Sequence, residues 1–166
     1  MKSYIVIWKR PLEVFKGMKV TTVIEQTSKY KHRIEYRPES NSFVESEYIS
    51  LMYDRKVKYP YGWIKESGTP PDKHLDIYIM TNKDFELGEE VKVEIIGLYY
   101  RLDSDHKFLG VLGDRGFRDY KELEVKEKED LNRIYNGKHE GEAWFGREKA
   151  EEVLREYFME HNNDIL

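Results

Sequence analysis

Carboxylate and cationic side chains recur along this sequence where short apolar segments begin, end or turn. Mg²⁺ takes oxygen ligands and is typically held by a few carboxylates together with substrate phosphates. Phosphate groups favour Arg, Lys and Tyr as donors. The inventory therefore predicts a metal and phosphate site, and the alternative, in a chain with 32 acidic residues, is a chance set of solvated charges. The residues concerned are Glu25, Arg33, Glu35, Asp76, Asp103, Asp105 and Lys107.

The stretch LDSDHK, residues 102–107, carries three of these residues between two apolar runs. Asp and Ser favour turns because their side chains hydrogen-bond to the nearby backbone. The pattern predicts a polar hairpin turn, and it is also compatible with the mouth of a metal and phosphate site.

Six segments have the β-branched, aromatic or alternating composition of strands. Side chains two apart on a strand share a face, which places Arg33 and Glu35 together. Arg33 could bind a ligand or pair with Glu35, and Asp76, where a loop enters a strand, could bind metal or cap a turn. If the sheet closes on itself, the charged residues could converge at one mouth. The expected strands are 19–27, 30–37, 42–49, 75–81, 91–102 and 107–112.

The last third of the chain has helical spacing instead. Apolar residues recur at helical intervals in 147–161, which predicts an amphipathic helix. A shorter helix is expected over 126–137, ended by Asn136-Gly137. Strands followed by helices predict an α+β fold: a small, closed or partly open, mostly antiparallel OB-like β-barrel with two C-terminal helices. The expected core includes Trp63, Trp144, Val153, Leu154, Tyr157 and Phe158.

Composition limits the function classes. The length of 166 residues suggests one domain, 1–166, and the chain has no Cys, which removes disulfides and thiolate chemistry. No P-loop, dinucleotide-binding fingerprint or nucleophile elbow is present. The net charge of −4 argues against nucleic-acid binding, although a Tyr-rich barrel that stacks single strands is a weaker alternative.

The apolar run at residues 4–8 has only five residues. That is too short for a signal-peptide core or a membrane span, so we expect a cytoplasmic protein that does not associate with membranes.

The ordered series of motifs over roughly residues 20 to 160 resembles the family I soluble inorganic pyrophosphatases. VIEQTSKYKHRIEY resembles the family's V-I-E-I-P segment and the K-Y-E that follows it. The match places Glu25 at the first acidic position, Arg33 at a phosphate-binding Lys position and Glu35 at the following Glu. YPYGWI resembles Y-P-x-N-Y-G-F-I and places Tyr61 at the active-site Tyr.

The later motifs follow in the same order. IIGLYYRLDSDHK resembles the family's strand and loop that carry metal ligands, and its loop is about three residues shorter. The match places Asp103 and Asp105 as ligands and Lys107 on phosphate. IYNG places Tyr135 at a further conserved Tyr of the family pattern.

The segment GTPPDKHLDIYIM occupies the place of the signature D-G-D-P-x-D-V and departs from it. Asp76 aligns with the last Asp, but Pro71 stands at the first and Lys73 at the middle one, the family's probable base. Asp72 is one residue out of register and is the nearest candidate to replace that base.

Two phosphate-binding cations of the family are also replaced, by Ser46 and Asn136. Arg55 and Lys138 lie near these two positions in the sequence and could compensate. Lys73 stands in place of a carboxylate and adds positive charge, so it could contact an extra phosphate or replace a metal.

The resemblance implies hydrolysis of diphosphate, or of a related phosphoanhydride, by a water that Mg²⁺ activates. The alternative is a non-catalytic relative that binds a phosphate-containing ligand or a partner. We expect a homo-oligomer. The implied roles are metal binding for Asp76, Asp103, Asp105 and Glu25, catalysis for Asp72, Tyr61 and Glu25, and phosphate binding for Arg33, Lys107, Tyr61, Tyr135 and Lys73.

Overall fold

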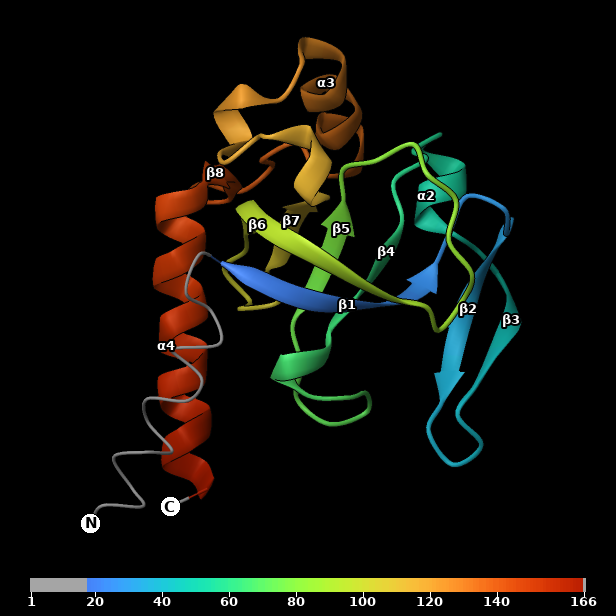
Figure 1. Ribbon diagram of the computed structural model, residues 1–166. Coiled ribbons are helices and arrows are strands. Elements are labelled where there is room, and N and C mark those ends of the chain that lie inside the picture. The colour runs from blue at the N-terminus through green and yellow to red at the C-terminus, as the bar shows by residue number, and fades with distance from the viewer. Residues whose placement is uncertain (1–17, 166) are drawn as a thin grey trace.

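A closed five-stranded barrel forms the centre of the protein (Figure 1). The computed structural model describes residues 18–165. The strand order is β1-β4-β5-β7-β6, and pairing of β6 with β1 closes the barrel. Its strands are β1 (Lys19–Gln26), β4 (Tyr61–Ile64), β5 (Asp76–Ile79), β6 (Glu90–Tyr100) and β7 (Lys107–Val111).

All barrel pairings are antiparallel except that of β5 with β7, which is parallel. This parallel pair sets Asp76 opposite Lys107, because each is the first residue of its strand. The β1–β4 register shifts between Ile24 and Gln26, so Glu25 lies at an irregularity of its strand. Such irregularities re-aim a side chain and are common beside active sites.

Close approach of β1 and β4 depends on Gly62. A Cβ on this residue would lie 1.8 Å from the carbonyl oxygen of Val23. Only glycine fits here, and the contact holds Tyr61 against the end of β1.

A separate hairpin of β2 (His32–Arg37) and β3 (Ser42–Ile49) flanks the barrel. It attaches through aromatic contacts: the Tyr36 ring lies 4.9 Å and the Phe43 ring 6.2 Å from the Trp63 ring. Gln26 also accepts a hydrogen bond from the Ile34 amide through its side chain, at 2.8 Å. The hairpin therefore forms a wall beside the ends of β1 and β4.

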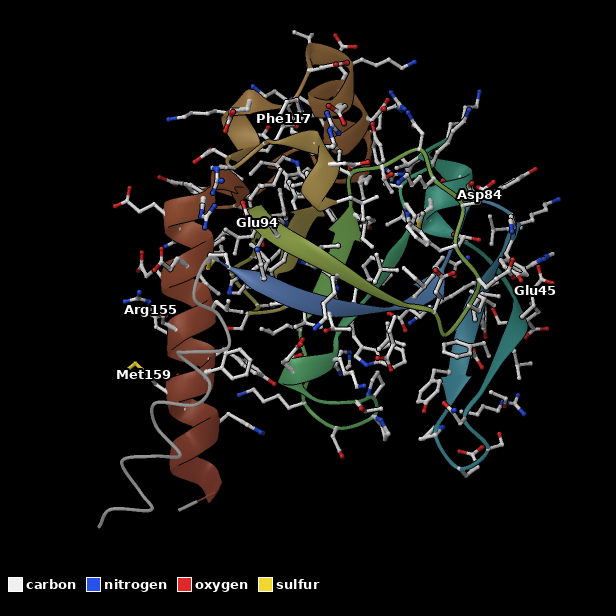
Figure 2. All side chains as sticks on the ribbon, viewed as in Figure 1. Glu45, Asp84, Glu94, Phe117, Arg155 and Met159 are labelled. Carbon is white, nitrogen blue, oxygen red and sulfur yellow. The ribbon has the colours of Figure 1, made fainter. Side chains whose placement is uncertain are left out.

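The C-terminal region consists of α3 (Val125–Ile134), the short strand β8 (Ala143–Gly146), which pairs with β6, and α4 (Arg147–Ile165). A further single-turn helix, α2 (Leu51–Asp54), lies between β3 and β4. Helix α4 contributes Leu154 to the barrel core, while its Arg155 and Met159 point away from the barrel (Figure 2).

The expected fold class and the two C-terminal helices are confirmed. Strands β4 and β8, and the single turn of α2, were not predicted from the sequence. Of the expected core residues, Trp144 is only half-buried. The others, Trp63, Val153, Leu154, Tyr157 and Phe158, are buried.

None of the helices within residues 18–165 combines the length and the apolar character needed to cross a membrane. The apolar run at residues 4–8 lies outside the described residues.

Candidate functional site

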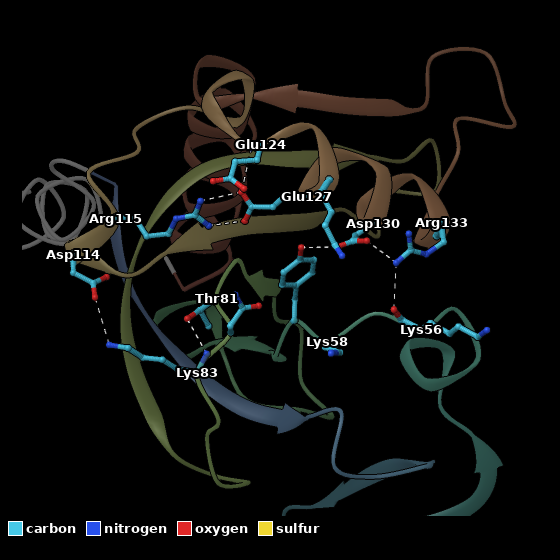
Figure 3. A pocket seen from close by; sticks show the side chains of 13 residues that line it. Lys56, Lys58, Thr81, Lys83, Asp114, Arg115, Glu124, Glu127, Asp130 and Arg133 are labelled. Carbon is cyan, nitrogen blue, oxygen red and sulfur yellow. Dashed lines mark hydrogen bonds and ion pairs between the residues drawn. The ribbon is translucent and has the colours of Figure 1, made fainter.

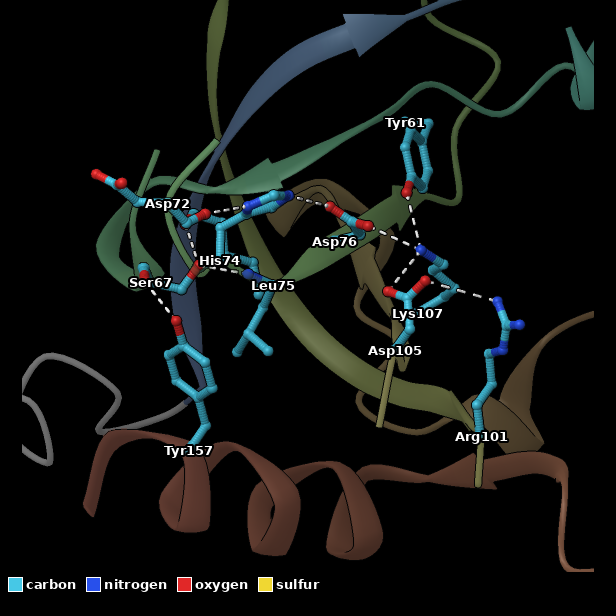
Figure 4. Close-up of polar contacts among 11 residues, drawn as sticks. Tyr61, Ser67, Asp72, His74, Leu75, Asp76, Arg101, Asp105, Lys107 and Tyr157 are labelled. Atoms are coloured by element: carbon cyan, nitrogen blue, oxygen red, sulfur yellow. Dashed lines mark hydrogen bonds and ion pairs between the residues drawn. The ribbon is translucent and has the colours of Figure 1, made fainter. Parts of the chain in front are cut away.

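A cleft of about 920 Å³ is lined on the barrel by the last residues of β1 and by the first residues of β4, β5 and β7. Charged and phenolic side chains from six strands (β1 to β5 and β7) and three loops meet in it, and Figure 4 shows its central contacts. The residues predicted from the sequence that line this cleft are Glu25, Arg33, Glu35, Tyr61, Asp76, Asp105, Lys107 and Tyr135.

Lys107 is the hub of these contacts. Its ammonium lies 2.8 Å from Asp76 Oδ2, 3.0 Å from Asp105 Oδ1 and 3.2 Å from the Tyr61 hydroxyl. An ammonium has three donors, so these three acceptors use all of them. Burial disfavours the charged amine, but the Asp76 and Asp105 carboxylates outweigh it and raise the pKa of Lys107.

Asp76 stays ionised although it is largely buried. Burial favours the neutral acid, but His74 and Lys107 outweigh it and lower the pKa of Asp76 to about 2. The Asp76 carboxylate therefore carries its charge at any physiological pH.

His74 lies between two oxygen acceptors that favour its protonated form. Its Nδ1 donates to the Asp72 carbonyl at 2.7 Å, and its Nε2 lies 3.2 Å from Asp76 Oδ1. The contact with Asp76 is the main reason that the pKa of His74 is raised. In its protonated form the imidazole adds positive charge to the same cleft.

Glu25 is the carboxylate whose protonation is balanced near neutrality. Burial, followed by repulsion from Asp76, raises its pKa to about 7, against attraction from His74, Lys107 and Arg33. Its carboxylate has no hydrogen bond or ion pair with any residue in the described part of the chain. A group with a pKa near the working pH is suited to accept or release a proton.

Arg33 reaches the cleft from β2 without an internal partner. It is exposed and forms no ion pair with Glu35 or with another acid among residues 18–161. The guanidinium is therefore free to bind an anion at the open side of the cleft. Tyr135 lines the far side, where its ring stacks on Tyr99 at 4.7 Å.

Three of the residues assigned by resemblance lie outside the cleft. The Asp72 side chain points away from Asp76 (Figure 4). The Lys73 amine lies 3.8 Å from Glu160 and 5.3 Å from the Tyr157 ring, toward α4. Asp103 is fully exposed, pairs with Arg101 at 3.0 Å and accepts the Asp105 amide.

Sequence reasoning missed His74. Its signal was the period-two spacing of His74, Asp76 and Tyr78, which places alternate side chains of an extended segment on one face. All three line the cleft.

The oxygen donors of the cleft fit a single Mg²⁺ that arrives with a phosphate ligand. Asp76 Oδ1 is buried and, although it is near His74, receives no well-aligned hydrogen bond, and the half-exposed Asp105 carboxylate contacts the same Lys107 ammonium as Asp76. Mg²⁺ is commonly held by one or two carboxylates, substrate phosphates and waters. No group of three acidic or histidine side chains in the described region is arranged as a ready metal site.

A second cavity, of about 460 Å³, lies between the residue 56–59 segment and the start of α3 (Figure 3). Its walls hold a bidentate Arg115–Glu127 pair at 2.6 and 2.9 Å, and the Tyr59 hydroxyl donates to Asp130 at 2.7 Å. Every residue predicted for the site lies outside its lining.

The solved structures whose overall fold matches this chain are inorganic pyrophosphatases. The enzyme from Neisseria gonorrhoeae matches 89% of this chain and 92% of its own, with a TM-score of 0.69 and 20% identity. The Thermus thermophilus enzyme matches 87% and 92%, with a TM-score of 0.64 and 18% identity. The chain has the inorganic pyrophosphatase fold.

The pyrophosphatase fold persists here across a large sequence distance. The type I enzyme from Toxoplasma gondii gives a TM-score of 0.54 at 15% identity over 88% of this chain and 80% of its own. No protein-family model and no curated protein sequence matches the chain. At these identities the similarity establishes the fold, and the chemistry must be argued from the residues of the cleft.

Proposed function

We propose that this protein hydrolyses a phosphoanhydride bond of a diphosphate in the cleft that Lys107 and Asp76 line. The observation that carries the proposal is the convergence of Glu25, Asp76 and Asp105 with Arg33 and Lys107 in one cleft of a chain with the pyrophosphatase fold.

Anion binding falls to the cations of the cleft. Arg33 offers a free planar guanidinium, which suits bidentate contact with a phosphate group. Lys107 would exchange one of its carboxylate contacts for a phosphate oxygen, because its three donors are already used. The Tyr61 and Tyr135 hydroxyls add donors along the walls.

Mg²⁺, held by Asp76 and Asp105 together with the substrate phosphates, would offset charge on the phosphoanhydride and on the leaving phosphate. Asp76 is suited to this role because it remains ionised.

Glu25 is the residue best placed to take the proton of the attacking water. The water oxygen forms a bond to phosphorus, the bridging P–O bond breaks, and one water proton passes to the Glu25 carboxylate. With a pKa of about 7, Glu25 is partly ionised at neutral pH and can accept this proton. Asp72, assigned to this task by resemblance, points out of the cleft.

The test is phosphate release from diphosphate in the presence of Mg²⁺. Glu25→Gln removes the proton acceptor with little change in shape, and we expect a loss of at least about 100-fold in kcat. Glu39→Gln, on the exposed turn of the hairpin, is the matched control and should retain full activity. Equal activity of the two variants would contradict the assignment of Glu25.

The contact of Lys107 with Asp76 and Asp105 favours a second function, the binding of a phosphate ligand without hydrolysis. The Lys107 ammonium fills the space between Asp76 and Asp105, which suits a protein that binds a phosphate ligand without turning it over. Calorimetric binding of diphosphate with no phosphate release, weakened by Lys107→Met, would establish this alternative and exclude hydrolysis.

A further inference from the structure

Exposed apolar side chains gather at one rim of the cleft. Tyr48, Ile49, Leu51 and Tyr53 are 64%, 47%, 42% and 50% exposed. They are four of the eight large hydrophobic residues exposed in the described part of the chain, and they fall within six consecutive positions. Exposed apolar side chains that cluster in this way, unlike scattered ones, indicate a binding surface.

The segment that carries this apolar rim is held in place. Between its apolar residues, the buried Ser50 donates its amide to the Lys31 carbonyl at 2.9 Å and accepts the Asp54 amide at 3.0 Å. The rim is therefore a fixed wall that joins β3 to α2, and its exposure does not come from a loose end.

The apolar rim and the charged floor belong to one cavity. Tyr48, Ile49 and Leu51 line the same 920 Å³ cleft as Arg33 and Lys107. Clefts of roughly 300–1,000 Å³ hold drug-sized organic ligands, so inorganic diphosphate would fill only a small part of this one.

Inorganic diphosphate also has no apolar group to place against the rim. It presents charged oxygens at both ends, and each oxygen set against an apolar wall loses water without gaining a donor. A ligand whose far end is apolar or aromatic avoids this loss and removes the rim residues from water.

We propose that the cleft takes an organic diphosphate, in which an apolar or aromatic substituent lies on Tyr48, Ile49 and Leu51 while the phosphates meet Arg33 and Lys107. This inference rests on the proposed function, since it names the substrate class of the same site. An aliphatic chain and an aromatic base both present an apolar surface to these residues, so the proposal covers both.

Calorimetry with Mg²⁺ tests the proposal with three probes: inorganic diphosphate, ADP and geranyl diphosphate. We expect ADP or geranyl diphosphate to bind at least about tenfold more tightly than inorganic diphosphate, from the burial of one or two apolar side chains. The better of the two identifies the substituent as aromatic or aliphatic.

Two variants then test whether the apolar rim is responsible for the difference in affinity. Ile49→Ser should weaken the preferred organic diphosphate about tenfold and leave inorganic diphosphate unchanged. Because Ile49 is exposed, this variant is expected to fold. Met159→Gln, an exposed apolar position on the outer face of α4, is the matched control and should bind both ligands as the wild type does.

The outcomes separate the inference from the proposed hydrolysis. Equal affinity for all three probes, or an Ile49→Ser variant that binds them as the wild type does, overturns the inference. A self-association that Ile49→Ser abolishes, with no change in ligand binding, also overturns it, since a second copy would then cover the rim. A preference for organic diphosphates without phosphate release supports the inference and contradicts hydrolysis.

Discussion

The Lys107 ammonium joins two carboxylates that would otherwise repel each other across the cleft. Asp76 comes from the start of β5 and Asp105 from the turn before β7, and both approach the same nitrogen. Any ligand cation must share these oxygens with Lys107, so the occupancy of the cleft depends on what the incoming phosphate offers to that amine. The free carboxylate of Glu25 and the free guanidinium of Arg33 lie outside this competition.

The two acids of the 102–107 turn are expected to behave differently. Asp105→Asn should lower phosphate release by at least about tenfold, because it removes a carboxylate that contacts Lys107 in the cleft. Asp103→Asn should have little effect, because Asp103 is fully exposed and pairs with Arg101. Steady-state kinetics on both variants make the comparison. Equal losses would support the role that the resemblance gives to Asp103.

The ionised Glu25 carboxylate is expected to lower the stability of the folded protein. Its pKa is raised to about 7 from an ordinary value near 4.5, so the folded state binds a proton more tightly than the unfolded state. The free energy of unfolding therefore falls as pH rises through this window, and the penalty is complete above pH 7. Without ligand, Glu25→Gln should gain about 1–3 kcal/mol at pH 8 and little below pH 4.

Urea denaturation at the two pH values measures this gain. A variant that is less stable than the wild type at pH 8 would show that the Glu25 carboxylate is stabilising, contrary to its burial and its repulsion from Asp76.

At the scale of elements, what the sequence could predict depended on the length of the pattern. The alternation in 30–37 and 42–49 closely matches β2 and β3, and the helical spacing of 147–161 falls inside α4. Strands β4 and β8 have four residues each and include glycine, so they show too little periodicity to be recognised.

Some of the candidate site could likewise be predicted from the sequence, and some of it could not. Asp76 and Lys107 begin strands that pair in parallel, so their convergence follows from recognising two strands and a closed sheet. Asp103 and Asp105 share one turn, and each pairs with a cation two residues away, Arg101 or Lys107, so the position of Lys107 in the cleft decides which acid faces it. Local spacing holds no information on that choice.

The ion pair between Glu127 and Arg115 at the start of α3 should contribute less stability at acidic pH. Glu127 binds Arg115 in bidentate fashion and accepts the Glu124 amide at 3.2 Å. Burial disfavours its charge, but these contacts outweigh burial and lower the pKa of Glu127. The stability they contribute is present above the ordinary Glu pKa and is lost as pH falls through the lowered folded value.

Glu127→Gln should cost about 1–3 kcal/mol at pH 7, because a charged bidentate contact is lost and Arg115 is left unpaired. Exposed Glu129 on the same helix supplies the control variant Glu129→Gln. Thermal melts at pH 7 and pH 4 measure both. A cost that is no smaller at pH 4 than at pH 7 would argue that packing, not charge, is responsible.

Over the whole molecule, one apolar core joins the barrel to the last helix. Leu154 is 2% exposed and lies in the same buried cluster as Ile24 of β1 and Phe108 of β7. The Tyr157 hydroxyl adds a 2.6 Å hydrogen bond to the carbonyl of Ser67, in the loop before β5. These contacts link α4 to strands far away in the sequence, so helix and barrel should unfold together.

Leu154→Ala is the substitution that tests this cooperativity. Loss of the buried side chain should cost about 2–5 kcal/mol and lower the Tm by several degrees, because the barrel can fill the cavity only in part. Urea transitions followed by far-UV circular dichroism, which reports on α4, and by tryptophan fluorescence, to which buried Trp63 contributes, should shift together. Met159→Ala, on the outer face of α4, controls for helix propensity. If the helical signal is lost at lower urea than the fluorescence signal, α4 docks on a barrel that is stable without it, and the chain is not one cooperative unit.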